Sequence, residues 1–557
     1  MSTTVAAEEG LTSTTRVHQP PEWTIMVYIS ADHILANFAI DTLKQLRDSA
    51  GGDVVVIAKF DDNQQENAHL YRFDVEGSTG TIESSRIHDD QLDKKKYTTI
   101  LVPEMSQQAG LTEFINYATD VSRTKYYCLI IWGHGIELLL DEGRRFLGET
   151  ALRSNKEGCS SEEYARRLAK TPVPARRYLT PLVLRQALEK TELAKGTLGD
   201  DHPKTKVDKD KEKVDKEKVK ERHALDMVGI DACSMSMIEF AYEIREHVDF
   251  MVASQEDVPD VSFPYAKILK DLKDKKKNYL KDLKEKPDYQ YPNEAREFAK
   301  LIPQLYEEAF HDYIASANTG VKGITLASLD LQKIDQIKNP LTKLSTALGR
   351  SIDNPVLRKK VLQARIDARD FVFGILVDLV DFCSCLQEQL PGVTANEFGD
   401  VSQQLLFACD KVSKALQEPG DGIVVANKSS DNRNSDPRNH GLSIYLPYRH
   451  EDKTDEVEEF FAKGTTRNPS KGRDPLTERT ERIGELEEDF NQQQLFLVEE
   501  NIGWTNFIRL GWSSLLVRED STKKKLDRYY CAQQVALNLF GAGPKNRDGA
   551  RPSGRAA

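Results

Sequence analysis

The sequence lacks the segments that would hold a protein in a membrane. It has no run of about 18 or more apolar residues. Residues 1–20 also lack the basic start and the apolar stretch of a secretion signal. We therefore expect a cytoplasmic protein that makes no membrane contact.

Several common catalytic signatures are absent as well. No G-x-x-x-x-G-K-[ST], H-E-x-x-H or G-x-S-x-G motif occurs, which disfavours nucleotide hydrolases, zinc proteases and serine hydrolases. The seven cysteines are odd in number, widely scattered and without a C-x-x-C pair, so neither a disulfide framework nor a metal site is indicated. Cysteine chemistry, or no chemistry, is left.

The chain has no strong excess of basic charge. Its 77 Lys and Arg residues face 89 Asp and Glu residues, which gives a formal net charge of −12. This balance argues against a chain that mainly coats nucleic acid. With 557 residues, of which 39% are hydrophobic and 30% charged, we expect several domain equivalents with charged insertions on a globular body.

Short apolar runs alternate with helical patterns along most of the chain. This alternation predicts an α/β fold with a largely parallel sheet and helices on both faces. The predicted strands are Trp23–Ser30, residues 53–62, Tyr126–Trp132, Met227–Ile230, a run from about Phe250, Gly323–Leu331, Asp421–Lys428 and Gly441–Pro447. The predicted helices are a stretch with Phe38, Ile40, Leu43 and Leu46 at helical spacing, Met105–Ser122, Thr180–Thr191, Lys270–Pro287 and Val356–Leu390.

Composition divides the chain into five parts. We expect a disordered tail at 1–22, an α/β domain at 23–270, a second α/β part at 271–452, a charged linker with a helical segment at 453–540, and a disordered tail at 541–557. The first domain contains a long insertion at 138–225. Within it, Lys204–Arg222 mixes both charges and has few apolar residues, so a solvated linker is favoured over nucleic-acid contact.

Two strand ends carry residues suited to cysteine chemistry. Gly133-His134-Gly135 follows one apolar strand, and Asp231-Ala232-Cys233 follows another. In parallel sheets, functional groups gather beyond the carboxyl ends of the strands. Cys233 would be the nucleophile and His134 its acid–base partner, with the Gly135 and Cys233 N–H groups as oxyanion donors. Taken singly, His134 and Cys233 each also fit a structural role at a strand end.

Five sequence blocks occur in an order that one protein family shares. The blocks are WTIMVYISAD, YYCLIIWGHG, VGIDACSMSMIEFAYEI, VASQED and GLSIYLP, between about Trp23 and Pro447. In this order they resemble the clostripain family of cysteine endopeptidases, which belongs to the caspase-like clan. The resemblance implies a caspase-like sheet and a catalytic dyad of His134 and Cys233, with no metal in the reaction steps.

The resemblance also implies a preference for basic residues before the scissile bond. In the family, an acidic residue two positions before the nucleophile lies in the primary specificity pocket, and Asp231 has this place. A carboxylate suits an Arg or Lys side chain there, although Asp231 could instead cap a strand-end turn. Many relatives carry P-G-D-G-W-x-Y, where this chain reads PDVSFPY from Pro259 to Tyr265, and Asp260 is expected in the pocket wall.

Relatives are commonly zymogens that are cut between the His and Cys blocks, and some respond to calcium. Basic cleavage sites in the 138–225 interval are Arg144-Arg145, Arg166-Arg167, Arg176-Arg177 and the lysines of 204–222. No EF-hand-like spacing is present, so calcium is a possibility of the family without a place in this sequence. No other cofactor is expected.

We therefore predict a zymogen-type, intracellular regulatory cysteine endopeptidase that cuts proteins after Arg or Lys. Its partners would be protein substrates, and the activating cut would be made by the enzyme itself or by an upstream activating protease. The alternative is a catalytically silent caspase-like interaction module. A third interpretation, a nucleic-acid binder, would depend on Lys204–Arg222 alone.

Overall fold

The computed structural model describes most of residues 21–446. Outside the described part lie 1–20, 32–34, 62–67, 76–80, 102–107, 137–138, 142–177, 180, 199–223, 260–261, 286–293, 317–322, 372–375, 432–436 and 447–557. The predicted linker and tail after residue 453 fall outside it, as does nearly all of the predicted N-terminal tail.

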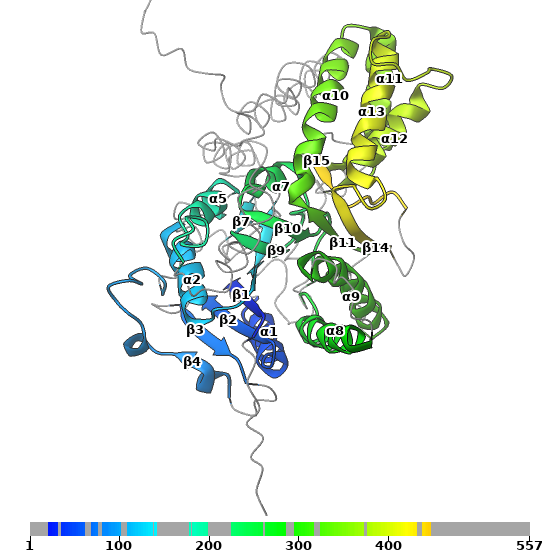
Figure 1. The fold of residues 1–557 in the computed structure, drawn as a ribbon. Coiled ribbons are helices and arrows are strands. Elements are labelled where there is room, and N and C mark those ends of the chain that lie inside the picture. The colour runs from blue at the N-terminus through cyan, green and yellow to red at the C-terminus, as the bar shows by residue number, and fades with distance from the viewer. Residues whose placement is uncertain are drawn as a thin grey trace, which may run out of the picture.

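A nine-stranded sheet forms the centre of the molecule (Figure 1). Its five middle strands, from β10 to β2, pair in parallel, and antiparallel strands extend it at both edges. The predicted α/β fold with a largely parallel sheet is therefore confirmed. In sheet order the strands are β14 (Val424–Asp431), β11 (Gly323–Asp330), β10 (Val248–Ala253), β9 (Leu225–Asp231), β5 (Tyr126–Trp132), β1 (Trp23–Ser30), β2 (Val54–Asp61), β3 (His69–Phe73) and β4 (Arg86–Ile87).

Both faces of the sheet are buried, which explains the continuous apolar runs of its strands. Along β1, Met26 and Tyr28 enter one hydrophobic core while Ile25, Val27 and Ile29 enter the other, because successive side chains point to opposite faces. The first core includes residues of α2 (Gln108–Val121), α5 (Pro181–Glu189), α7 (Ile238–Ile244) and the 3-10 helix η4 (Leu331–Ile337). The second includes residues of α1 (Ala36–Ser49), α8 (Tyr265–Glu285) and α9 (Glu294–Ser316).

The predicted helices on the two faces are largely confirmed. The stretches Met105–Ser122 and Thr180–Thr191 contain α2 and α5. Helix α1 buries Leu43 and Leu46 as expected, but Ile40 is 37% exposed and Ala39 takes the inward place. The predicted boundary between the two α/β parts at 270 falls within α8.

The second half of the chain completes the same sheet and adds a helical layer above it. Strands β11 and β14 join the sheet edge beyond β10. Figure 1 shows the helices α10 to α13 grouped beside this edge. They are α10 (Lys338–Ser351), α11 (Pro355–Asp367), α12 (Leu379–Gln389) and α13 (Val401–Gln417).

The prediction of a helix over Val356–Leu390 is wrong in its middle part. Helix α11 ends at Asp367, and two strands, β12 (Asp370–Phe371) and β13 (Leu376–Asp378), precede α12. The run FVFGILV between the helices is rich in β-branched and aromatic residues, and β13 pairs with β15 (Ser443–Tyr445). This long-range partner selects the strand over the helix.

A small sheet, separate from the nine-stranded one, begins just after the end of β5. It consists of β6 (His134–Ile136), β7 (Leu139–Asp141) and β8 (Tyr178–Leu179), all antiparallel. Because β8 leads into α5 with a single residue between them, part of the 138–225 insertion is ordered against the body of the protein. None of the helices in the described part combines the length and the apolar character needed to cross a bilayer.

Candidate active site

The ends of β5 and β9 bring the two predicted catalytic positions to one edge of the sheet. These strands are parallel neighbours, and Trp132 is the register partner of Asp231. Just beyond this pair, the Gly133 N–H donates to the Asp231 carbonyl at 3.3 Å. His134 and Cys233 each lie two residues past the Trp132–Asp231 pair. Since paired strands are about 4.8 Å apart, the backbones of both residues leave the sheet side by side.

Cys233 lies in a turn and is only partly buried. Among the five described cysteines, it is the one that is not buried. Ser234 follows it with φ +58, a left-handed conformation that non-glycine residues seldom adopt. Such strain is common where a backbone must present a functional group. The Cys233 turn is therefore shaped to hold the sulfur at the rim of the sheet.

A second loop runs beside the Cys233 turn and contacts the sulfur. The Ser234 N–H donates to the Glu256 carbonyl at 3.0 Å and the Ser236 N–H to the Ser254 carbonyl at 2.8 Å. From the same loop, the Val258 N–H donates to Cys233 Sγ at 3.3 Å. A hydrogen bond from an N–H group favours the ionised form of its acceptor, and the thiolate is the reactive form of cysteine. The 254–258 loop thus supplies a donor suited to a nucleophilic sulfur.

His134 is described through its backbone alone. It begins β6 and is the register partner of Asp141 in β7, next to Gly135 opposite Leu140. The side chain of His134 lies outside the described residues, as does Asp260. The basic pairs Arg144-Arg145, Arg166-Arg167 and Arg176-Arg177 and the stretch Lys204–Arg222 also lie outside them.

The Asp231 carboxylate is buried and holds the loop that follows β10. Asp231 is 3% exposed, and its Oδ2 accepts from the Phe263 N–H at 3.0 Å and from the Tyr265 hydroxyl at 2.7 Å. The Ser262 hydroxyl donates to the same oxygen. This half of the carboxylate does what the alternative interpretation of Asp231 expected, since it ties down a turn near a strand end.

The other carboxylate oxygen of Asp231 has a different environment. Asp231 Oδ1 is buried and has no hydrogen-bond partner among the residues that the structure describes. Burial raises the pKa of Asp231 to about 6, because the hydrogen bonds from Ser262, Tyr265 and the Phe263 N–H offset the loss of solvent only in part. Unsatisfied buried acceptors are rare in folded proteins. Asp231 Oδ1 is therefore a candidate acceptor for a group brought by a ligand.

Ser262 is one of the positions at which the chain departs from the family run P-G-D-G-W-x-Y. It stands where that run has its second glycine, and its φ of +67 is a conformation that glycine adopts easily. Its hydroxyl interacts with Asp231 and with the Trp132 indole N–H, which links the ends of β5 and β9. The contacts of this hydroxyl to both strand ends offset the free-energy cost of the strained Ser262 backbone.

Several contributors to the site had no signal in the sequence. Val258 acts through its main-chain N–H, which every residue except proline carries. In the sequence, Ser262 and Tyr265 are only parts of a divergent run, although a polar residue at a position where the family has glycine is a usable signal. Within the described part of the chain, no group of three or more His, Cys, Asp or Glu residues is arranged to hold a metal ion.

Comparison with known proteins supports one family. The model of the clostripain family, Peptidase C11, matches residues 214–466. This segment contains Asp231, Cys233 and the GLSIYLP block, whereas His134 precedes it. No curated protein matches the chain.

The chain is also similar to solved structures of C11 proteases at low identity. One is a secreted C11 cysteine protease from Bacteroides thetaiotaomicron in complex with an irreversible peptide inhibitor, at 14% identity and a TM-score of 0.44, with 80% of this chain and 99% of that chain covered. Another is an inactive zymogen C11 protease from Parabacteroides distasonis, at 14% identity and a TM-score of 0.43, with 80% and 98% covered.

The burial of Asp231 predicts how stability depends on pH. The folded chain holds the Asp231 proton more tightly than the unfolded chain between the ordinary pKa of 3.8 and the folded value of about 6. The free energy of unfolding of the wild type should therefore fall, relative to that of Asp231→Asn, by about 3 kcal/mol as pH rises through this window. Urea unfolding of both proteins across the window measures the difference. A difference that stays constant with pH would contradict the buried carboxyl.

The clostripain-family match thus covers the segment that carries Asp231 and Cys233, and it spans less than half of the chain.

Proposed function

We propose that the protein is an endopeptidase that cuts protein substrates after Arg or Lys through a dyad of Cys233 and His134. One observation carries the proposal. Trp132 and Asp231 are register partners at the ends of neighbouring parallel strands, so the chain leaves the sheet at His134 and at Cys233 from adjacent positions. An imidazole and a thiol at one sheet edge are the two groups that nucleophilic cysteine catalysis needs.

The reaction follows from these positions. The Cys233 thiolate attacks the carbonyl carbon of the scissile bond, and the tetrahedral oxyanion lies against the Gly135 and Cys233 N–H groups. His134 donates a proton to the leaving amine, which leaves a thioester on Cys233. His134 then takes a proton from water, the resulting hydroxide attacks the thioester, and the acid product leaves with the Cys233 thiolate and the protonated His134 restored. Val258 supports the sulfur throughout by its N–H contact.

Replacement of the dyad tests the chemistry. Cys233→Ala should lower kcat/KM for fluorogenic Arg and Lys peptides by on the order of 10³-fold or more, and His134→Ala should have a loss of similar size because the two groups act as a unit. Cys385→Ala is a matched control, because Cys385 is 8% exposed and lies on α12. Steady-state kinetics after activation measures the effect.

Two results would contradict the proposed dyad. Full activity in Cys233→Ala would assign the nucleophile to another residue. The complete absence of turnover in activated wild type would instead favour the silent interaction module.

The preference for basic residues is supported by Asp231 Oδ1. This buried oxygen has no hydrogen-bond partner among the described residues, and a guanidinium or ammonium group would supply a charge-assisted bond to it. A long side chain is needed to reach an oxygen on a residue that is 3% exposed. Arg and Lys meet both requirements, whereas a short or an apolar side chain fails at least one of them.

A comparison of two variants tests whether Asp231 determines substrate specificity or only stabilises the loop that follows β10. Asp231→Asn should lower kcat/KM for Arg and Lys peptides about tenfold or more, and change turnover of a Leu peptide little, because only the basic peptides lose an ionic partner. Ser262→Ala is the control, since it removes a contact to Asp231 Oδ2 and keeps the charge. In the wild type, kcat/KM for basic peptides should fall below about pH 6, where Asp231 gains a proton. Equal losses on all peptides would assign Asp231 to loop support alone.

Activation by cleavage within 138–225 is a further part of the proposal. The described portion of this interval contains α5, which is anchored by contacts to two other helices, α2 and α7. Arg185 Nε of α5 lies 2.7 Å from Glu243 Oε1 of α7, and the Thr112 hydroxyl of α2 donates to the Ala187 carbonyl at 3.0 Å. Leu184 and Leu188 are fully buried in the core. A cut before Tyr178 or after Leu198 would therefore leave α5 in place.

Association of the cut fragments tests this anchoring. Limited trypsin treatment should yield fragments that separate under denaturing conditions and co-elute in native gel filtration, because burial of two leucines contributes about 3–6 kcal/mol. Leu188→Ala combined with Arg185→Ala should weaken the association, whereas Lys195→Ala, at an exposed position, should not. Activity that is full in the intact single chain would contradict activation by cleavage. The cytoplasmic, regulatory role stays a prediction, and cell fractionation tests it.

A further inference from the structure

The C-terminal end of the described chain lies directly on the turn that carries Cys233. The Ser443 N–H donates to the Ser236 carbonyl at 2.9 Å. In return, the Ser236 hydroxyl donates to the Gly441 carbonyl at 2.6 Å. Met237 and Ser443 also form an isolated parallel bridge. Residues about 200 positions apart in the sequence thus share one hydrogen-bonded layer.

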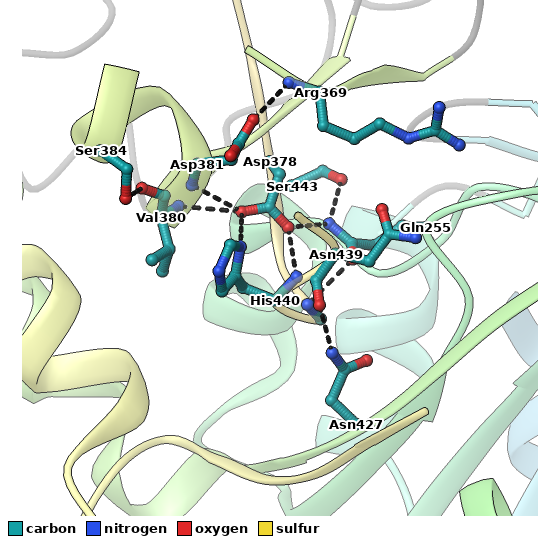
Figure 2. A network of polar contacts seen from close by, with 11 residues as sticks. Gln255, Arg369, Asp378, Val380, Asp381, Ser384, Asn427, Asn439, His440 and Ser443 are labelled. Carbon is teal, nitrogen blue, oxygen red and sulfur yellow. Dashed lines mark hydrogen bonds and ion pairs between the residues drawn. The ribbon is translucent and has the colours of Figure 1, made fainter. Parts of the chain in front are cut away.

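Gln255 connects this C-terminal segment to the loop beside Cys233. Its side chain is 1% exposed. The amide Nε2 donates to Asp378 Oδ2 at 3.0 Å and to the Ser443 hydroxyl at 2.9 Å, while Oε1 accepts from the Gly441 N–H at 2.9 Å. Figure 2 shows Gln255 between Asp378 and Ser443. Both ends of the amide are therefore held by segments distant in sequence.

Asp378 and His440 fix the far side of this contact. Asp378 is fully buried and accepts five hydrogen bonds (Figure 2). Oδ1 accepts from His440 Nδ1 at 3.0 Å and from the N–H groups of Val380 and Asp381 at the start of α12, while Oδ2 accepts from the His440 N–H at 2.7 Å and from Gln255. Such a fully paired buried carboxylate has a single orientation.

The surroundings of His440 shift the pKa of its ring. Burial lowers the pKa of His440, but the hydrogen bond and the negative charge of Asp378 more than offset it, so the pKa is raised. Asp381 adds a further negative charge, and Arg438 lies near Asp381 on the same side. His440 Nδ1 thus lies 3.0 Å from a buried carboxylate that favours the protonated ring.

The loop from Ser254 to Val258 connects Gln255 to the Cys233 sulfur by hydrogen bonds. The carbonyls of Ser254 and Glu256, on either side of Gln255, accept from the N–H groups of the Cys233 turn. The Glu256 carboxylate also pairs with Arg369 at 2.6 Å. The N–H of Val258, three residues after Gln255, donates to Cys233 Sγ. A shift of Gln255 would therefore move the donor away from the sulfur.

We propose that Gln255, held by Asp378 and His440, is a positioning residue for Cys233: it fixes the 254–258 loop so that the Val258 N–H stabilises the thiolate. The inference deepens the proposed function and depends on Cys233 as its nucleophile. Gln255 does not touch the reacting atoms. It acts through the main chain, so its loss should alter the ionisation of the sulfur and the rate of acylation, and leave substrate binding nearly unchanged.

The test replaces Gln255 by Glu in the full-length chain. This isosteric change removes the Nε2 donors and places a second carboxylate about 3 Å from Asp378. The readout is the rate of Cys233 alkylation by iodoacetamide against pH, followed by peptide mass spectrometry, which reports the pKa of the thiol. Loss of a hydrogen bond to the thiolate should raise that pKa by about one unit. In the activated enzyme, kcat should fall about tenfold at neutral pH with KM within about twofold.

A second variant keeps the test decisive if Gln255→Glu fails to fold. His440→Ala removes the ring bond to Asp378 and keeps the backbone bond, so it should shift the alkylation profile in the same direction by a smaller amount. Asn354→Ala is the control, because it removes the cap of α11, where Asn354 Oδ1 accepts from the Val356 and Leu357 N–H groups, and does not touch the 254–258 loop. It should lower stability and leave the alkylation profile unchanged.

The possible outcomes separate this inference from the proposed function. Alkylation profiles of Gln255→Glu and His440→Ala that coincide with the wild type would overturn the inference, as would an equal shift in Asn354→Ala. Full peptidase activity in Cys233→Ala would overturn the proposed function instead. In that case the alkylation profile would still report whether Gln255 controls the sulfur.

Discussion

Trp132 and Asp231 face each other across the parallel pair β5 and β9, and the arrangement of the candidate site follows from this register. A slip of one residue would turn every side chain of β9 to the opposite face of the sheet. The register is set by burial on both faces, since every residue of both strands is buried. The same packing that stabilises the sheet therefore decides where the chain leaves it at His134 and Cys233.

The loop from Ser254 to Tyr265 is the second support of the site. At its start it is hydrogen-bonded to the Cys233 turn and, through Gln255, to the C-terminal segment. At its end it is held by Asp231 Oδ2 through Phe263 and Tyr265. One loop thus joins the candidate nucleophile, the candidate specificity carboxylate and the 439–446 segment.

The two oxygens of Asp231 differ in their surroundings, and each fits one of the two roles that the sequence presented as alternatives. Oδ2 ties down the loop, as expected of a residue that caps a strand-end turn, while Oδ1 is buried without a partner among the described residues. A carboxylate has two oxygens and can serve both purposes. The raised pKa of Asp231 reflects the free energy lost when a charge is buried with its hydrogen bonds only partly restored.

By itself, the sequence determined the strands at the centre of the sheet, their burial on both faces and the places of His134 and Cys233 at strand ends. Continuous apolar runs and abrupt Gly or Asp boundaries are local signals, and local signals can be read without the fold. The tertiary structure alone decided that β13 is a strand, that Gly441 and Ser443 reach the Cys233 turn, and that Val258 faces the sulfur. These contacts join segments far apart in the chain, and several of them use main-chain N–H groups, which are the same in almost every residue and leave no mark in the sequence.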